Sequence, residues 1–349
     1  MFLPVKCADC TDVLNRLMHA IQRILEYSVQ SLFQPLDFQV LSDLVGPEFA
    51  PLLSYSKIRS AIERIFQLSY LEKLEICNAF VNDAAFDQHI NDDAYHLSAL
   101  SESGAKALKL LCDPLYDIAG RGFPFGSSSP KFSGKLLRQQ YAAINNLLGR
   151  VCPVCVGEIL FTKGEGQNDH YFPRSKFPTL TLHPYNLLPT CPNCNGSSFK
   201  HEKSPVDEAD AGPGELQTVF LPYLRPAKPE VTLGVGENCN IVITPSHGTD
   251  KHTVQRIQNM DRLYKLEDRW SGVLSNVCDD IESEWQSICT QYSMTSERLA
   301  ALRKLLKNNA SNTKNRSDFI KGVYCEWLLT KSDSALEKWI SSYQQLIIE

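Results

Sequence analysis

Several features are absent from this sequence. No run of residues approaches the 18 or so consecutive apolar positions that a membrane-spanning helix requires. The first residues, MFLPVKCADCTDV, lack the charged and then apolar order of a signal peptide. We find no internal repeat. We therefore expect a cytoplasmic protein that makes no membrane contact.

The charge is uneven along the chain. The net charge of the 349 residues is -5, which argues against a general nucleic-acid coat protein. Residues 1–117 hold 9 basic and 16 acidic residues, whereas residues 118–157 hold five basic residues and no acid. Residues 296–322 hold seven basic and two acidic residues. A polyanion is expected to avoid the first region and to approach the other two, although solvated helix faces explain either basic patch equally well.

The apolar pattern predicts a mainly α fold with one small embedded α+β module. Helical spacing fills the first 115 residues and returns from about residue 250. A chain of this length favours several lobes over one core. Two strand-like runs, 216–224 and 240–244, suggest a hairpin. The predicted regions are an acidic helical region at 1–119, a Gly/Pro/Ser-rich linker (120–134) and basic helix within 120–149, the module at 150–205, and a hairpin-like segment followed by helices at 206–349.

Two Cys-Pro-x-Cys knuckles stand out among the 12 cysteines. They are Cys152/Cys155 and Cys191/Cys194. A two-residue gap lets both sulfurs of a knuckle face one ion, and two knuckles complete a tetrahedral shell for structural Zn²⁺. A third pair, Cys7 and Cys10, has no partner pair and is weak evidence for a second zinc.

The residues between and around the knuckles resemble the HNH endonuclease family in its four-cysteine zinc form. The matching pattern is C-x2-C, then D-H, then N-L-x-P-x-C-x2-C-N with a lysine soon after, within residues 150–205. Many members of that family have histidine where this chain has Asn195. The resemblance implies a ββα-metal fold in which His170 is the general base. Asp169 and Asn195 then hold one Mg²⁺ or Mn²⁺, and Asn186 positions His170.

The chemistry of phosphodiester hydrolysis agrees with these residue types. The reaction needs an activated water, a Lewis acid on the phosphate and neutralisation of the leaving oxygen. A neutral histidine is suited to take the proton of the water. Adjacent residues of a strand face opposite sides, so Asp169 and His170 can serve one site only if the chain bends toward Pro173. Candidates for contact with DNA phosphates are Arg174, Lys176, Lys200 and Lys203.

Our prediction is a metal-dependent endonuclease that hydrolyses DNA, with Zn²⁺ as a structural ion. The resemblance further implies an effector of bacterial restriction or anti-phage defence. Its expected partners are an ATPase or other regulatory subunit, or a second copy bound through the acidic N-terminal region. The alternative is a non-catalytic zinc module that binds nucleic acid or protein, in which the Asp-His pair is fortuitous. RNA ranks lower as a substrate because no aromatic-rich basic stretch is visible. We expect His183 to make a hydrogen bond in a turn and His201 to be exposed.

Overall fold

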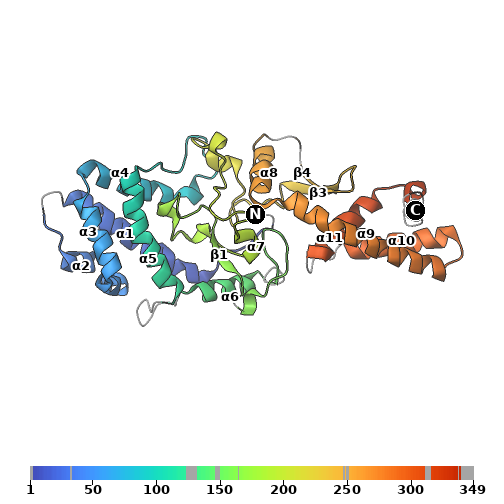
Figure 1. Ribbon diagram of the computed structural model, residues 1–349, viewed down its shortest axis with the longest axis horizontal. Coiled ribbons are helices and arrows are strands. Elements are labelled where there is room, and N and C mark those ends of the chain that lie inside the picture. Colours follow the sequence, from blue (N-terminus) through green and yellow to red (C-terminus); the bar gives the residue numbers. More distant parts are fainter. Residues whose placement is uncertain are drawn as a thin grey trace.

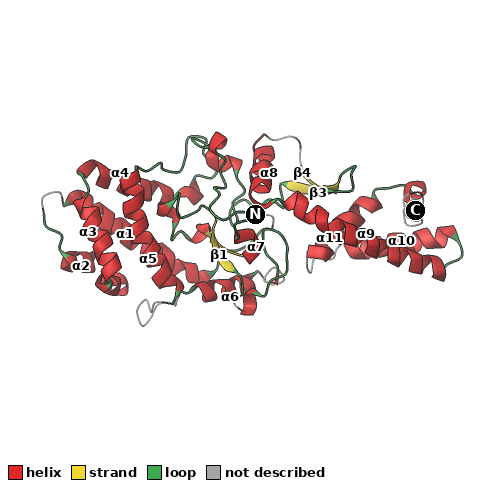
Figure 2. Cartoon of the chain, in the orientation of Figure 1, coloured by secondary structure: helices red, strands yellow, loops and turns green. Residues whose placement is uncertain are grey.

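The protein is mainly helical with two small antiparallel sheets, which confirms that the fold is mainly α (Figures 1 and 2). The computed structural model describes residues 3–31, 34–122, 132–145, 150–163, 165–246, 248, 251–310, 316–336 and 338. Most of the linker predicted at 120–134 and the end of the basic helix that follows it lie outside the described residues.

The N-terminal region is a bundle of helices at the left of Figure 1. Its helices are α1 (Asp12–Gln30), α2 (Phe38–Phe49), α3 (Ser56–Gln67), α4 (Tyr70–Ala84) and α5 (Glu102–Gly120). Helix α1 contacts α2 and α4, and α3 lies against α5. Apolar residues three and four apart place one buried stripe on each helix, which is why this sequence forms a bundle. In α1 the stripe is Val13, Leu14, Leu17, Ile21, Ile24 and Leu25.

The small module occupies the middle of the molecule. Helix α6 (Gly134–Ile144) precedes it, and its elements are β1 (Gln167–His170), β2 (Leu187–Thr190) and α7 (Pro192–Asn195). The two strands are antiparallel, with His170 opposite Leu187 and Gln167 opposite Thr190. The order is strand, strand and helix, but α7 has only four residues.

Strand β2 lies between two hydrophobic cores. All of its residues are buried. Leu187 belongs to the core that the N-terminal helices form, and Leu188 belongs to the core shared with the C-terminal region. Successive side chains of a strand point to opposite faces, so one strand can serve both cores. The module is therefore held from two sides.

The C-terminal region begins with the second sheet. Its elements are β3 (Val231–Val235), β4 (Ile241–Pro245), α8 (Lys251–Tyr264), α9 (Leu266–Gln291), α10 (Thr295–Ala310) and α11 (Arg316–Leu329). Strand β4 covers 241–244 of the predicted run 240–244, but its partner is β3, so the hairpin predicted with 216–224 is wrong. Residues 216–224 instead form a 3-10 turn and a short buried loop. Pro222 within that run cannot donate a hydrogen bond to a ladder.

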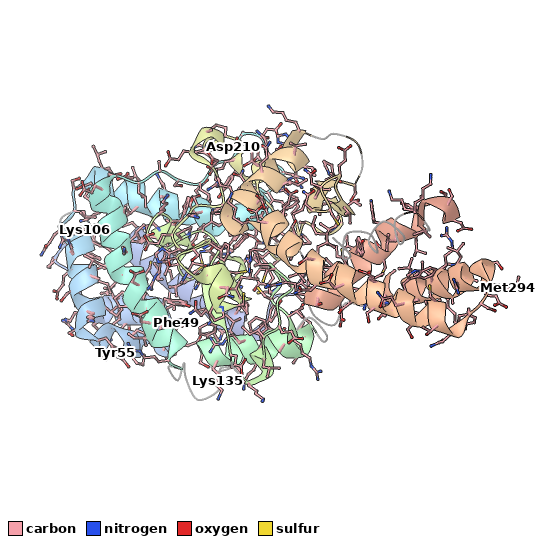
Figure 3. All side chains as sticks on the ribbon, turned by 45° about the vertical axis from the view of Figure 1, so that its right-hand side comes forward. Phe49, Tyr55, Lys106, Lys135, Asp210 and Met294 are labelled. Carbon is pink, nitrogen blue, oxygen red and sulfur yellow. The ribbon has the colours of Figure 1, made fainter. Side chains whose placement is uncertain are left out.

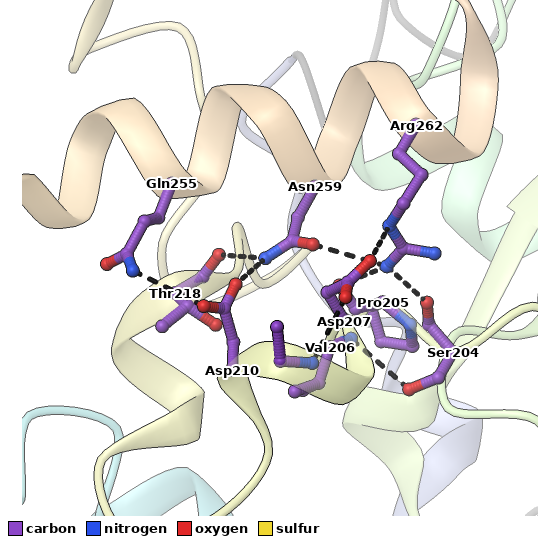
Figure 4. A network of polar contacts seen from close by, with 10 residues as sticks. Ser204, Pro205, Val206, Asp207, Asp210, Thr218, Gln255, Asn259 and Arg262 are labelled. Atoms are coloured by element: carbon purple, nitrogen blue, oxygen red, sulfur yellow. Dashed lines mark hydrogen bonds and ion pairs between the residues drawn. The ribbon is translucent and has the colours of Figure 1, made fainter.

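Helix α8 is joined to the segment after the module by polar contacts (Figure 4). The side-chain amide of Asn259 donates to Asp210 and to the carbonyl of Thr218, each at 3.0 Å. Arg262 pairs with Asp207 at 2.9 Å. Helices α9, α10 and α11 then extend away as an arm at the right of Figure 1. In the described part of the chain, no helix combines the length and apolarity needed to cross a membrane.

We predict that Leu187→Ala lowers the free energy of unfolding by about 2–5 kcal/mol, because it opens a cavity where β2 meets the N-terminal core. Urea denaturation followed by circular dichroism measures this loss. The matched control, Leu71→Ala, removes a side chain that is 74% exposed and should change stability by less than about 0.5 kcal/mol. Equal losses in the two variants would contradict the placement of β2.

Candidate functional site

The four knuckle cysteines form one buried cluster. Their sulfur atoms all lie within 4.8 Å of one another. The Sγ atoms of Cys152 and Cys194 are 3.8 Å apart, and those of Cys155 and Cys191 are 3.7 Å apart. Four sulfurs bound at about 2.3 Å to a central tetrahedral zinc ion are separated by about 3.8 Å. The cluster could therefore hold a metal ion such as zinc.

The first knuckle is a tight turn built by its backbone. The N–H of Cys152 donates to the carbonyl of Gly157 at 2.8 Å, and the N–H of Val156 donates to the carbonyl of Cys152 at 2.9 Å. Val156 has a φ of 57°, in the left-handed region that a β-branched residue rarely adopts. Such strain persists only where the surroundings impose it, here where the turn brings two sulfurs together.

The second knuckle begins α7. Cys191 is the N-cap of this helix, and its sulfur accepts from the N–H of Cys194 at 3.4 Å. Pro192 at the first helical position suits this start because its missing N–H would have no partner there. The N–H of Cys191 also donates to the sulfur of Cys152 at 3.4 Å, which ties one knuckle to the other.

Two arginines from the C-terminal arm reach the sulfur cluster. Arg316 of α11 donates to the sulfur of Cys155 at 3.0 Å and to its carbonyl at 3.1 Å. Arg269 of α9 donates to the sulfur of Cys194 at 3.4 Å. Hydrogen bonds from the other cysteines lower the pKa of Cys155, and Arg316 acts in the same direction. Sequence reasoning missed both arginines, because no motif links them to cysteines so distant in the chain.

Beside the cluster is a cavity of about 300 Å³ that Asp169, His170 and Asn195 line together. Arg174, from the turn after β1, and Tyr116, from α5, also line it. The structure thus brings together the predicted base and both predicted metal ligands. Although Asp169 and His170 are neighbours in β1, both reach this cavity because β1 ends at His170 and the chain turns at Pro173.

Asp169 forms a buried ion pair with Lys200. Its Oδ1 accepts from the Lys200 ammonium at 2.8 Å, and the side chains are 3% and 0% exposed. The same ammonium donates to the carbonyl of His170 at 2.6 Å. Burial raises the pKa of Asp169 to about 6, against the lowering effect of Lys200. The second carboxylate oxygen, Oδ2, is buried and has no hydrogen-bond partner among the described residues.

The His170 ring has a defined tautomer. Its Nε2 lies 3.0 Å from the carbonyl of Thr181, which can only accept, so Nε2 carries the proton. Nδ1 of the neutral ring then keeps a lone pair. The ring also packs against Tyr116, with centroids 4.5 Å apart. Burial lowers the pKa of His170 to about 3, so the ring is neutral at physiological pH.

Two asparagines form hydrogen bonds with the segments next to the site. Asn186 is fully buried; its Oδ1 accepts from the N–H of Phe172 at 2.6 Å, and its Nδ2 donates to the carbonyls of Phe172 and Leu180. It therefore ties the turn after β1 to the residues before β2. The Nδ2 of Asn195 donates to Gln167 at 2.8 Å, and this bond does not use its Oδ1.

The four residues predicted to contact DNA phosphates differ in position. Lys176 and Lys203 are exposed. Arg174 lies at the cavity but is 3.7 Å from Asp113 and 3.6 Å from Asp117. Lys200 is fully buried, so its ammonium cannot reach a phosphate at the surface, and we correct its predicted role to that of partner for Asp169.

His183, His201 and the third cysteine pair are not part of the cluster. His183 is buried; its Nε2 is 3.2 Å from the carbonyl of Ala84 and its Nδ1 accepts from the N–H of Tyr185. His201 is exposed. Within the described residues, the four-cysteine cluster is the one group of three or more potential metal ligands, and Cys7 and Cys10 are not part of it.

We predict that the purified protein contains about one zinc ion per chain and that Cys152→Ser loses it, because three sulfurs cannot complete the tetrahedral shell. The variant should also unfold at a lower temperature, since metal binding contributes to folding. Elemental analysis after gel filtration measures the zinc. The control is Cys239→Ser, at an exposed cysteine outside the cluster; zinc retained by Cys152→Ser would count against the site.

Acid should destabilise the fold through His183. Burial lowers the pKa of His183 to about 4, below the ordinary value near 6.5, so the folded state resists protonation. Its contribution to stability is complete above pH 6.5 and is lost as the pH falls toward 4. We expect a loss on the order of 1–2 kcal/mol between pH 6.5 and 5.

Urea denaturation at several pH values measures this dependence. His183→Gln should make it shallower by this amount, because glutamine does not titrate, and the buried His170 should supply the rest. His201→Gln at an exposed position should leave it unchanged. An identical pH dependence in wild type and His183→Gln would show that another group is responsible.

Comparison with known proteins adds no relative: no protein-family model matches the chain, and no significant match was found among curated proteins or solved structures. The chemistry of the site therefore rests on its own residues. The Oδ2 of Asp169, which has no partner in the described part of the chain, and the amide oxygen of Asn195 belong to residues of the same cavity. Such oxygens are the donors that a hard divalent cation prefers.

Proposed function

We propose that the protein is a metal-dependent endonuclease of the HNH type that hydrolyses phosphodiester bonds in DNA and carries a structural zinc ion. The observation that supports this most strongly is the shared cavity. A neutral histidine, a buried carboxylate and an asparagine line it together, and the asparagine directly follows Cys194 of the cysteine cluster. These are the groups that hydrolysis of a phosphodiester requires.

His170 is the proposed general base. Its Nε2–H is bound to the carbonyl of Thr181, so its Nδ1 is the atom that accepts the proton of a water. The oxygen of that water then attacks phosphorus, and the bond from phosphorus to the leaving oxygen breaks. A base works best when its pKa is near the working pH. An anionic phosphate in the cavity raises the pKa of His170 from its low value, because a nearby negative charge favours the protonated ring.

Asp169 and Asn195 are the proposed ligands of Mg²⁺ or Mn²⁺. When bound, such an ion polarises the phosphate and stabilises the charge on the leaving oxygen. The donor set fits, because the free Oδ2 of Asp169 and the Oδ1 of Asn195 belong to residues of one cavity. Lys200 already neutralises one negative charge on Asp169. We therefore expect weak cation binding until a substrate phosphate adds negative charge.

The same ion pair supports a second candidate, a non-catalytic zinc module that binds nucleic acid or a protein. In that case Lys200 and Asp169 are purely structural partners, as buried ion pairs often are. The predicted role in restriction or anti-phage defence and the ATPase, regulatory or self-association partner rest on the family resemblance alone and stay predictions.

Plasmid DNA incubated with Mg²⁺ or Mn²⁺ tests the proposal. Wild type should nick or cut it, and His170→Ala should lower the rate by about 10²–10⁴-fold, the usual contribution of a general base. Asn195→Ala should lose metal-dependent cleavage while the zinc content stays unchanged. His201→Ala is the matched control, because His201 lines the same cavity but has no proposed role.

Two results would contradict the proposal. Full metal-dependent cleavage by folded His170→Ala would exclude that residue as the base. No cleavage of plasmid, linear DNA or RNA by zinc-loaded wild type, with binding retained, would favour the non-catalytic module.

A further inference from the structure

A large groove runs between α3 and α5 on the N-terminal bundle. Its volume is about 1000 Å³, and residues of both helices line it. Tyr55 and Lys106 mark opposite ends of this pair of helices in Figure 3. The groove residues on α5 recur every three or four positions, so they form one stripe along the helix. They include Lys106, Lys109, Asp113 and Asp117, and Arg121 follows at the end of the helix.

The groove is basic although its region is acidic. Five cations line it (Lys57, Arg64, Lys106, Lys109 and Arg121), against two acids. All five cations are exposed. Among the described residues, Lys57, Arg64 and Lys106 form no ion pair. Lining charges of one sign along a concave surface attract a polyanion more strongly than the net charge of the chain suggests.

The start of α3 adds to this attraction. The groove includes Ser56, Lys57 and Ser60 in the first turns of the helix. Within the described residues, the N-cap Tyr55 makes no side-chain capping hydrogen bond to the first turn of α3. Free N–H groups at a helix N-terminus, together with the helix dipole, favour phosphate oxygens. The start of α3 thus adds to the attraction that the five basic side chains exert on phosphate groups.

Helix α5 and Arg174 connect the groove to the catalytic cavity. Tyr116 of α5 lines the cavity with His170, and its neighbour Asp117 lines the groove. Arg174 lines the cavity and contacts Asp113 and Asp117 at 3.7 and 3.6 Å. The two acids, which oppose a polyanion, are thus partly neutralised where groove and cavity meet. One arginine shared by two carboxylates leaves one negative charge, and the five cations of the groove outnumber it.

The size of the groove suits a run of phosphates. From residue 106 to residue 121, α5 rises by about 22 Å. One strand of B-form DNA presents a phosphate about every 3.4 Å along the axis, so roughly six phosphates span that length. Five cations on two facing helices match such a run better than they match a small anion.

We propose that the α3–α5 groove holds the sugar-phosphate backbone of a nucleic-acid strand and leads it into the cavity of His170. This rests on the proposed nuclease function for the direction of the strand, but the binding itself does not depend on catalysis. The N-terminal bundle is then a substrate-binding element, in spite of its overall charge.

Binding in the absence of cleavage tests the proposal. Each protein carries His170→Ala, and anisotropy of a fluorescein-labelled DNA duplex of about 30 base pairs reports affinity between about 50 and 200 mM salt. The groove variant is Lys57→Gln/Lys106→Gln/Lys109→Gln. We expect it to bind roughly tenfold or more weakly at about 100 mM salt and to lower the salt-dependence slope by about 2.7, which is 0.9 for each lost phosphate contact.

The matched control is Lys228→Gln/Lys304→Gln/Lys307→Gln. These lysines are exposed and lie outside the groove, and both triple variants lower the net charge by three. The control also removes two cations from the basic patch at 296–322, where the sequence alone places a polyanion. An equal loss in both variants, or a loss in the control alone, would overturn the groove.

Three substrates and one activity assay complete the test. Duplex DNA, a single strand of the same sequence and an RNA duplex show which form the groove accepts; the groove variant must weaken at least one of them relative to the control. If wild type fails to cleave while the groove variant loses binding, the proposed nuclease activity is contradicted and the proposed binding groove is supported. If wild type cleaves and the groove variant binds and cleaves as well as wild type, the proposed binding groove is contradicted and the proposed nuclease activity is supported.

Discussion

Four cysteine sulfur atoms meet at one buried point, although 35 residues separate the two knuckles that supply them. This convergence fixes the start of the module against α7, and α7 in turn carries Asn195. The strand pairing of β1 with β2 then sets Asp169 and His170 beside it. Arg269 and Arg316 bind the same sulfurs, so the C-terminal arm depends on the cluster too. In our proposal a zinc ion at this point is structural, and the cavity next to it does the chemistry.

The module has little hydrophobic core of its own, and its strand β2 packs into the cores of the N-terminal and C-terminal regions. Leu187 packs with the N-terminal helices and Leu188 with the C-terminal region. The buried pair of Asp169 and Lys200 adds a polar constraint that only one arrangement satisfies. Removing one member of such a pair leaves a buried charge without compensation, which costs more stability than the pair contributes. The site is therefore rigid because hydrophobic, ionic and sulfur contacts all meet at one short hairpin.

Local patterns predicted the parts of this structure that local physics determines. Helical spacing gave the bundle, and the gap within each knuckle gave the four-cysteine cluster. Patterns in one segment say nothing about distant partners. The predicted pairing of 240–244 with 216–224 was therefore wrong, because the partner is β3, and Arg316 was missed. Lys200 was predicted to contact phosphates at the surface, because its ion pair with Asp169 cannot be seen in the sequence. The net acidity of residues 1–117 likewise concealed the basic groove, because charge on a surface depends on which helix faces meet.

The central claim is that all four sulfurs bind one metal ion and so hold the pair of strands β1 and β2 in place. X-ray absorption at the zinc edge of the purified protein measures this most directly. The account predicts a single shell of four sulfur ligands at about 2.3 Å, with no nitrogen or oxygen ligand. A shell that mixes sulfur with nitrogen or oxygen ligands at about 2.0–2.1 Å would contradict it, because a sulfur would then be missing from the cluster.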